Sequence, residues 1–190
     1  MKSEYYYLRC DLSDKFPFSI TRVELNGADS MLVYGLKRIN KWDERIRFYY
    51  SEYSTPADFE IPMVCPLHYA TKFFIDALDA DLLNYFNFIP VEINPEKDGP
   101  IIKDYYIVDY VYTLATLDMN LSEVVYDQER PDEIMTVPHC VLDKSKIPSN
   151  IQAFRLQESP TNVIISKQVM DNLNKNSVTG TRFVPVEMNQ

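Results

Sequence analysis

The residues best suited to chemistry are two histidines and two cysteines that occur in pairs. Cys65 lies three positions before His68, and His139 is adjacent to Cys140. Four such side chains could hold a tetrahedral zinc ion, and a cysteine beside a histidine could act as a nucleophile. However, the spacing lacks the paired-ligand pattern of zinc sites, and neighbouring residues on a strand point to opposite faces. We therefore expect no metal, no cofactor and no catalytic residue; Cys65 should be buried, and His68 partly exposed on a helix.

Three aspartates close together form a second candidate for chemistry. Asp76, Asp79 and Asp81 could supply the paired carboxylates of a hydrolase. A solvated helix end is the simpler interpretation, because the predicted helix finishes in this region. Asp76 and Asp79 lie toward the C-terminal part of this helix, where the macrodipole disfavours acidic groups, which could indicate a cationic partner. Asp79 and Asp81 are the candidates for contact with such a partner.

The most acidic stretch is residues 123–133. Its carboxylates face a single basic residue, Arg130, and are Glu123, Asp127, Glu129, Asp132 and Glu133. A segment of this charge could imitate a phosphate backbone or enter a basic catalytic cleft, and its field would speed association with a basic protein. An ordinary solvated loop is the alternative, since many charge runs need no partner.

Tyrosines near the N-terminus form another candidate surface. The residues concerned are Tyr5, Tyr6, Tyr7, Tyr49, Tyr50 and Tyr53. Tyrosine is enriched at interaction hot spots, but strands with two covered faces also favour it. Both interpretations stay open at this point.

Composition limits the choice of partners and compartment. The 190 residues carry a formal charge of −9, which repels nucleic acid and anionic membranes, so we expect neither as a partner. The three cysteines are widely spaced and odd in number, which favours a reducing compartment. No signal peptide and no membrane span are recognisable. These features predict a cytoplasmic protein.

A sequence repeat organises the chain. Residues 88–94 read FIPVEIN and residues 183–189 read FVPVEMN, and eight of the 24 aligned pairs between 71–94 and 166–189 are identical. Such self-similarity indicates one structural unit used twice. We predict two extended–helix–strand units, at about 59–94 and 154–189, within an α+β fold of mixed, mainly antiparallel sheets.

Hydrophobic periodicity gives the expected elements. Helices are predicted over residues 66–79 and 166–176. Strands are predicted over residues 5–12, 20–25, 31–39, 45–51, 88–93, 104–117, 135–142 and 183–188. A soft boundary near residue 55 would separate an N-terminal β-rich segment, 1–55, from the duplicated region, 56–190; one continuous domain is equally compatible with the sequence.

Short motifs in the second half resemble a known family. Residues 154–156 read Phe-Arg-Leu, residues 163–166 read Val-Ile-Ile-Ser, and residues 179–185 follow the pattern Thr-Gly-x-x-Phe-x-Pro. This order resembles a bacterial immunity-protein family of polymorphic toxin systems, immunity family eleven, formerly a domain of unknown function. The similarity covers roughly residues 59–189. It implies a cytoplasmic protein, encoded beside a toxin, that binds the toxin and occludes its site. No catalytic residues are implied, and Gly180 is expected to supply a positive φ.

Three functional hypotheses follow. The first is a non-enzymatic immunity protein that binds a cognate toxin, for which the negative charge favours a basic protein such as a nuclease. The second is a structural or adaptor protein of a secretion system. The third is a hydrolase, which would require a deep pocket uniting the cysteine–histidine pairs. An internal repeat is also compatible with a homo-oligomer.

Overall fold

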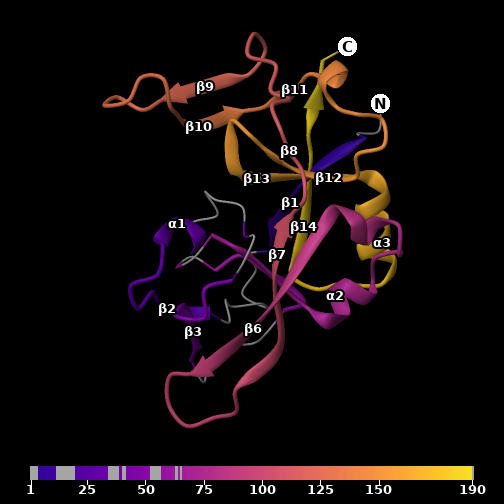
Figure 1. The fold of residues 1–190 in the computed structure, drawn as a ribbon. Coiled ribbons are helices and arrows are strands. Elements are labelled where there is room, and N and C mark those ends of the chain that lie inside the picture. The colour runs from indigo at the N-terminus through magenta and orange to yellow at the C-terminus, as the bar shows by residue number, and fades with distance from the viewer. Residues whose placement is uncertain are drawn as a thin grey trace.

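A five-stranded sheet forms one half of the protein (Figure 1). The computed structural model describes residues 4–11, 20–33, 39, 42–51, 57–62, 64 and 66–189. The strands of this sheet, in spatial order, are Thr181–Pro185 (β14), Tyr5–Cys10 (β1), Ser159–Ser166 (β13), Ala153–Leu156 (β12) and Thr113–Leu114 (β8). All neighbours are antiparallel except β8 and β12, which are parallel.

A six-stranded sheet forms the other half. Its strands, in spatial order, are Ile20–Glu24 (β2), Arg47–Tyr50 (β3), Phe86–Pro95 (β6), Ile102–Tyr110 (β7), His68–Thr71 (β5) and Phe59–Glu60 (β4). The β6–β7 hairpin is its longest pairing, and only β3 and β6 run parallel. The prediction of mixed, mainly antiparallel sheets is confirmed.

Two small ribbons and a few short helices complete the described part of the chain. Glu123–Tyr126 (β9) pairs with Ile134–His139 (β10), and Val141–Leu142 (β11) pairs with Glu187–Met188 (β15). The helices are Ser30–Val33 (α1), Lys72–Asp76 (α2), Leu82–Tyr85 (η1), Lys144–Lys146 (η2) and Lys167–Lys175 (α3). Within the described residues, no helix has the length and apolar character needed to cross a membrane.

The N-terminal segment contributes to both large sheets. β1 lies between β13 and β14, with Tyr7 opposite both Ile164 and Val184. β2 and β3 instead extend the six-stranded sheet beside β6. The proposed division at residue 55 stays a prediction.

The predicted helix at 66–79 is correct only in its second half. Residues 68–71 form β5, and the helix α2 begins after Thr71, whose side chain accepts a hydrogen bond from the Phe74 N–H. His68, Tyr69 and Ala70 are all buried, because β5 lies between β4 and β7 with both faces covered. This tertiary burial overrides the helical pattern of the apolar residues.

Other predicted elements agree more closely. The helix predicted at 166–176 is α3, capped by Ser166. The long strand predicted at 104–117 is divided into β7 and β8. The strand predicted at 31–39 is wrong where it is described, because residues 30–33 are helical; residues 34–38 lie outside the described part.

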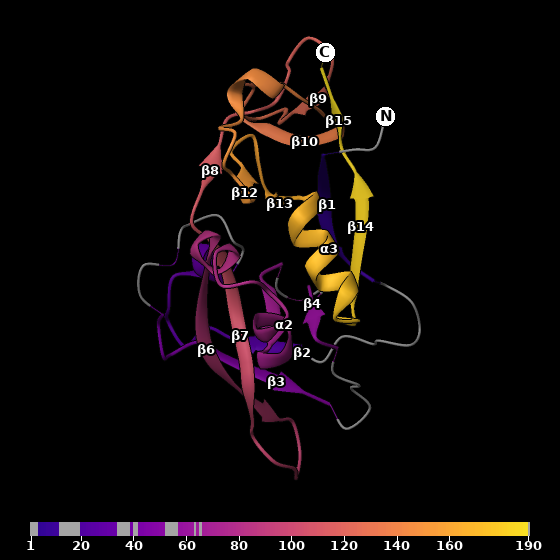
Figure 2. The same cartoon turned by 90° about the vertical axis from the view of Figure 1, so that its right-hand side faces the viewer.

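The main core joins the two sheets through the helices. Phe74 of α2, Leu173 of α3, Val108 of β7 and Leu8 of β1 are fully buried in one cluster. Each such side chain contributes roughly 1.5–3 kcal/mol through burial. The helices α2 and α3 are neighbours (Figures 1 and 2), and at their C-terminal ends the Asn176 side chain donates to the Ala77 carbonyl at 3.1 Å.

The predicted turn at Gly180 connects the segment between α3 and β14 to β4 through hydrogen bonds. Gly180 has φ of 77°, as expected. The preceding Thr179 exchanges four hydrogen bonds with the backbone or side chains of Asp58 and Phe59, at 2.6–3.2 Å. A Cβ on Gly180 would lie 2.1 Å from the Phe59 carbonyl oxygen. The glycine is therefore required both for its φ and for this close approach.

Candidate partner-binding surface

The acidic segment 123–133 lies within a β-hairpin that projects from the five-stranded half (Figure 1). β9 and β10 are antiparallel, with Tyr126 opposite Ile134 and Val125 opposite Thr136. No strand was predicted from the sequence for residues 123–126, which form β9. The signal was present in the β-branched and aromatic run Val124, Val125 and Tyr126, which favours strands. We call residues 123–139 the acidic hairpin.

Arg130 organises the tip of the acidic hairpin. The Asp127 carboxylate accepts hydrogen bonds from the backbone N–H groups of Glu129 and Arg130 at 2.8 and 3.0 Å, an Asx turn. The Arg130 guanidinium contacts Asp127 at 3.2 Å and Glu133 at 2.6 Å. The backbone hydrogen bonds, with help from Arg130, lower the pKa of Asp127. The tip is thus an ordered, charged turn.

The other carboxylates of the hairpin keep their charge exposed. Glu123, Glu129 and Asp132 are exposed, and within the described residues no ion pair involves them. Five carboxylates and one guanidinium give the acidic hairpin a formal charge of −4. The structure therefore concentrates a large part of the net charge of −9 on one projecting element.

Apolar side chains are exposed beside these charges. Met135 is 69% exposed and Leu121, just before β9, is 55% exposed. Val125 and Tyr126 are also exposed, at 40% and 45%. Interfaces commonly combine apolar and aromatic anchors with a polar rim. The acidic hairpin presents both kinds of group.

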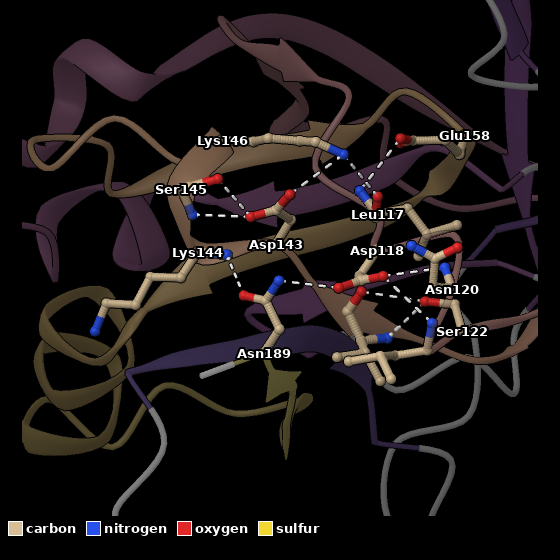
Figure 3. Close-up of polar contacts among 12 residues, drawn as sticks. Leu117, Asp118, Asn120, Ser122, Asp143, Lys144, Ser145, Lys146, Glu158 and Asn189 are labelled. Atoms are coloured by element: carbon tan, nitrogen blue, oxygen red, sulfur yellow. Dashed lines mark hydrogen bonds and ion pairs between the residues drawn. The ribbon is translucent and has the colours of Figure 1, made fainter.

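A polar network fixes the chain at the base of the hairpin (Figure 3). One Asp118 carboxylate oxygen accepts from the backbone N–H groups of Asn120 and Leu121, and the other accepts from the Asn189 side chain at 2.9 Å. The side-chain oxygen of Asn189, Oδ1, accepts from the Lys144 N–H at 3.0 Å. This network joins the segment before β9, the turn after β11 and the end of β15.

A second set of contacts tightens the same base. The Ser122 hydroxyl donates to the Val141 carbonyl at 3.1 Å and accepts from the Val141 N–H at 3.0 Å. The Lys146 ammonium donates to the Leu117 carbonyl at 3.1 Å, and the Leu117 N–H donates to the Glu158 carboxylate at 3.2 Å (Figure 3). A fixed base reduces the conformational entropy that a surface loses on binding.

The other predicted acidic residues lie elsewhere. Asp79 and Asp81 are exposed between α2 and η1, and the Asp79 N–H donates to the Asn172 side chain of α3 at 2.9 Å. In both views this region lies far below β9 and β10 (Figures 1 and 2). The fold does not bring the two predicted acidic groups together.

The cysteine–histidine pairs do not form one site in the described residues. His68 is buried, its Nδ1 lies 2.6 Å from the Tyr110 hydroxyl, and burial lowers its pKa well below the ordinary value. The interpretation of His68 as a partly exposed helix residue is therefore wrong. His139 is exposed on β10, whereas the adjacent Cys140 is buried. Cys65 lies outside the described residues, within which no group of three His, Cys, Asp or Glu could hold a metal.

Three surface hollows lie in the described part of the chain. One hollow is lined by Leu32 and Trp42 with two neighbouring acidic residues, a second lies near Ser166, and a third near Arg45. Among the described residues, these three hollows are lined by no histidine and no cysteine.

The arginine of the Phe-Arg-Leu motif connects the two large sheets. Arg155 of β12 pairs with buried Asp109 of β7 at 3.3 Å. Its guanidinium also lies over the Tyr110 ring, 5.4 Å from the centroid. Arg155 thus forms an ion pair with the buried Asp109 carboxylate and connects the two large sheets.

The N-terminal tyrosines largely serve the fold. The hydroxyl of Tyr5 donates to the Ile151 carbonyl at 3.2 Å, and that of Tyr50 donates to the Pro100 carbonyl at 2.8 Å. The Tyr49 hydroxyl donates to a Glu24 carboxylate at 2.8 Å, while Tyr53 lies outside the described residues. The structure places a different tyrosine, Tyr126, on the acidic hairpin.

Almost the whole chain matches one known protein family. Residues 13–188 match the immunity protein family Imm11. The match therefore reaches well before residue 59, where the sequence resemblance began. No curated protein matches the sequence.

Proposed function

Since the chain belongs to the immunity protein family Imm11, we propose that it binds a cognate bacterial toxin and blocks that toxin's active or binding site. It acts without catalysis, in the cytoplasm of the cell that makes the toxin. The observation that carries the proposal is the acidic hairpin, a charged and partly apolar element with a fixed base. The groups that contact the toxin are the exposed Glu123, Glu129, Asp132 and Glu133 and the partly exposed Asp127.

Charge on the acidic hairpin favours a basic toxin. A formal charge of −4 on one projecting element creates a field that a basic surface, such as the substrate cleft of a nuclease, would meet first. Such steering raises association rates by roughly 10- to 1,000-fold at low salt. It also makes the association rate depend strongly on ionic strength.

Apolar groups on the same element supply the short-range part of the binding energy. Met135 and Tyr126 of the hairpin, and Leu121 just before it, are exposed in the free protein, so a partner that covers them removes apolar surface from water. Charged residues at the rim mainly set the encounter rate, whereas buried anchors set the lifetime of a complex. The acidic hairpin combines the two roles.

Growth of cells that express the toxin tests this proposal. The toxin gene adjoining that of this chain is expressed alone and together with the wild-type chain, which should restore growth. The double variant Glu129→Lys/Asp132→Lys should protect poorly, because it changes the charge of the hairpin from −4 to 0.

The control carries the same change of charge at a distant place. The variant Asp79→Lys/Asp81→Lys raises the net charge of the chain from −9 to −5, as the hairpin variant does. Equal loss of protection in both variants would refute the hairpin as the contact surface, or would include Asp79 and Asp81 in it. An adjoining gene product that is harmless, or unaffected by the wild-type chain, would refute the immunity function.

We also propose that the segments at about 59–94 and 154–189 are one unit used twice. Thr71 and Ser166, 95 positions apart, both cap a helix that follows a strand. Each helix then carries a lysine–aspartate ion pair at i,i+4, Lys72 with Asp76 and Lys167 with Asp171. If the units are equivalent, alanine at either cap should destabilise the protein by about 0.5–2 kcal/mol. A loss of stability in only one of the two alanine variants would contradict the equivalence of the two units.

A further inference from the structure

The outer strand of the acidic hairpin has an open edge. β9 pairs with β10 alone, and no other strand of the described residues pairs with it. In both views β10 lies between β9 and the five-stranded sheet, so β9 is the outer strand (Figures 1 and 2). Hydrogen-bonding direction alternates along a strand. Two of the four residues of β9 therefore direct their N–H and C=O groups away from β10.

Unlike its partner, β9 contains neither a proline nor a bulge. Proteins commonly guard edges with proline, bulges or charged side chains. β10 contains Pro138 and two register shifts. After Glu123, β9 reads Val124, Val125 and Tyr126, which have high strand propensity and no charge. The exposed edge is thus the one best suited to accept another strand.

We propose that the toxin adds an extended, basic segment to the outer edge of β9. This proposal rests on the toxin-binding function inferred above. In strand addition the backbone hydrogen bonds provide affinity, and alternating side chains provide specificity. The exposed Val125 and Tyr126 would contact apolar side chains of the added strand. Lysine or arginine side chains of the same strand would meet Glu129 and Asp132 at the tip.

Charge argues against a second copy of the chain as the occupant. Pairing two β9 edges would place two hairpins of formal charge −4 side by side. Like charges that face each other across an interface oppose association. A segment rich in lysine and arginine has the complementary charge, so the favoured occupant is a basic partner.

Hydrogen–deuterium exchange on the full chain, free and bound to the purified toxin, tests this inference. In the complex, the outward-directed amides of residues 123–126 should exchange at least about 10-fold more slowly. A single segment of the toxin that contains lysine or arginine should be protected in parallel. Binding that leaves these amides unprotected would overturn strand addition and leave the immunity function intact. Failure of the toxin to bind would overturn both.

Two proline variants provide an independent test of the same edge. Because neighbouring N–H groups point in opposite directions, one of Val124→Pro and Val125→Pro removes an outward N–H, and the other removes one that faces β10. The outward variant should keep the unfolding midpoint of the wild type and bind the toxin at least about 10-fold more weakly. Toxin binding with wild-type affinity in that variant would contradict the proposal. So would amide protection of β9 that increases with the concentration of the free chain, because it would indicate that two copies of the chain pair through this edge.

Discussion

The turn at Gly180 yields the most quantitative prediction, because the chain contains its own control. Gly180 has φ of 77° and Gly27 has φ of 81°, so both turns require a left-handed backbone. A Cβ on Gly180 would lie 2.1 Å from the Phe59 carbonyl oxygen and 2.7 Å from the Ala57 Cβ. A Cβ on Gly27 would find its nearest neighbour, an Arg45 guanidinium nitrogen, at 3.8 Å. Alanine therefore meets the same backbone strain at both positions and a steric clash at only one.

The two substitutions should differ by the cost of that clash. Holding an L-residue in the left-handed region costs about 1–2 kcal/mol, and this applies to Gly27→Ala and Gly180→Ala alike. Overpacking against fixed backbone adds about 1–3 kcal/mol. We therefore expect a loss of about 1–2 kcal/mol in unfolding free energy for Gly27→Ala and about 2–5 kcal/mol for Gly180→Ala.

Urea unfolding of both variants measures this difference. The midpoints should fall in the order wild type, Gly27→Ala, Gly180→Ala, and an unchanged slope would show that the denatured state is the same. A difference of 2 kcal/mol corresponds to about 4–8 °C in Tm for a chain of this size. Equal stability of the two variants would refute the close packing of the turn on Phe59.

Three further predictions follow from particular contacts. Arg155→Ala removes the guanidinium that pairs with the buried Asp109 carboxylate; it should lower the unfolding free energy by about 3–5 kcal/mol, and a loss of less than about 1 kcal/mol would contradict the assigned role. His68 is buried with a lowered pKa, so the unfolded chain gains a proton near pH 6.5 that the folded chain refuses; stability should fall below about pH 6.5 by up to about 1.4 kcal/mol per pH unit. His68→Gln should reduce this slope; an unchanged slope in this variant would refute the assignment. Met135→Ala should keep the unfolding midpoint, because this side chain is 69% exposed, and weaken toxin binding by about 1–2 kcal/mol; unchanged calorimetric affinity would remove it from the interface.

Local signals in the sequence predicted those elements whose stability is itself local. Ser166 and the apolar spacing after it correctly predicted α3. The Thr-Gly pair correctly predicted a positive φ at Gly180. In contrast, the sequence pattern of β5 predicts the start of a helix. The segment forms a strand because it is buried between β4 and β7.

The sequence predicted the charge of the candidate surface but not its β-hairpin structure. The five carboxylates of residues 123–133 were recognised from charge alone, but the segment was assigned no strand. Its form depends on contacts from distant parts of the chain, such as the Asn189 side chain that holds Asp118. Separation of Asp79 and Asp81 from the hairpin likewise follows from sheet order, which the sequence does not encode in any short pattern.

The most direct test of the account is the association rate of the chain with its toxin as a function of salt. At low ionic strength, Glu129→Lys/Asp132→Lys should associate roughly 10-fold or more slowly than the wild type, and the difference should largely disappear in about 1 M salt. Asp79→Lys/Asp81→Lys should associate nearly as fast as the wild type. Equal rates for the wild type and the hairpin variant at low salt would contradict the central claim that the acidic hairpin receives the toxin.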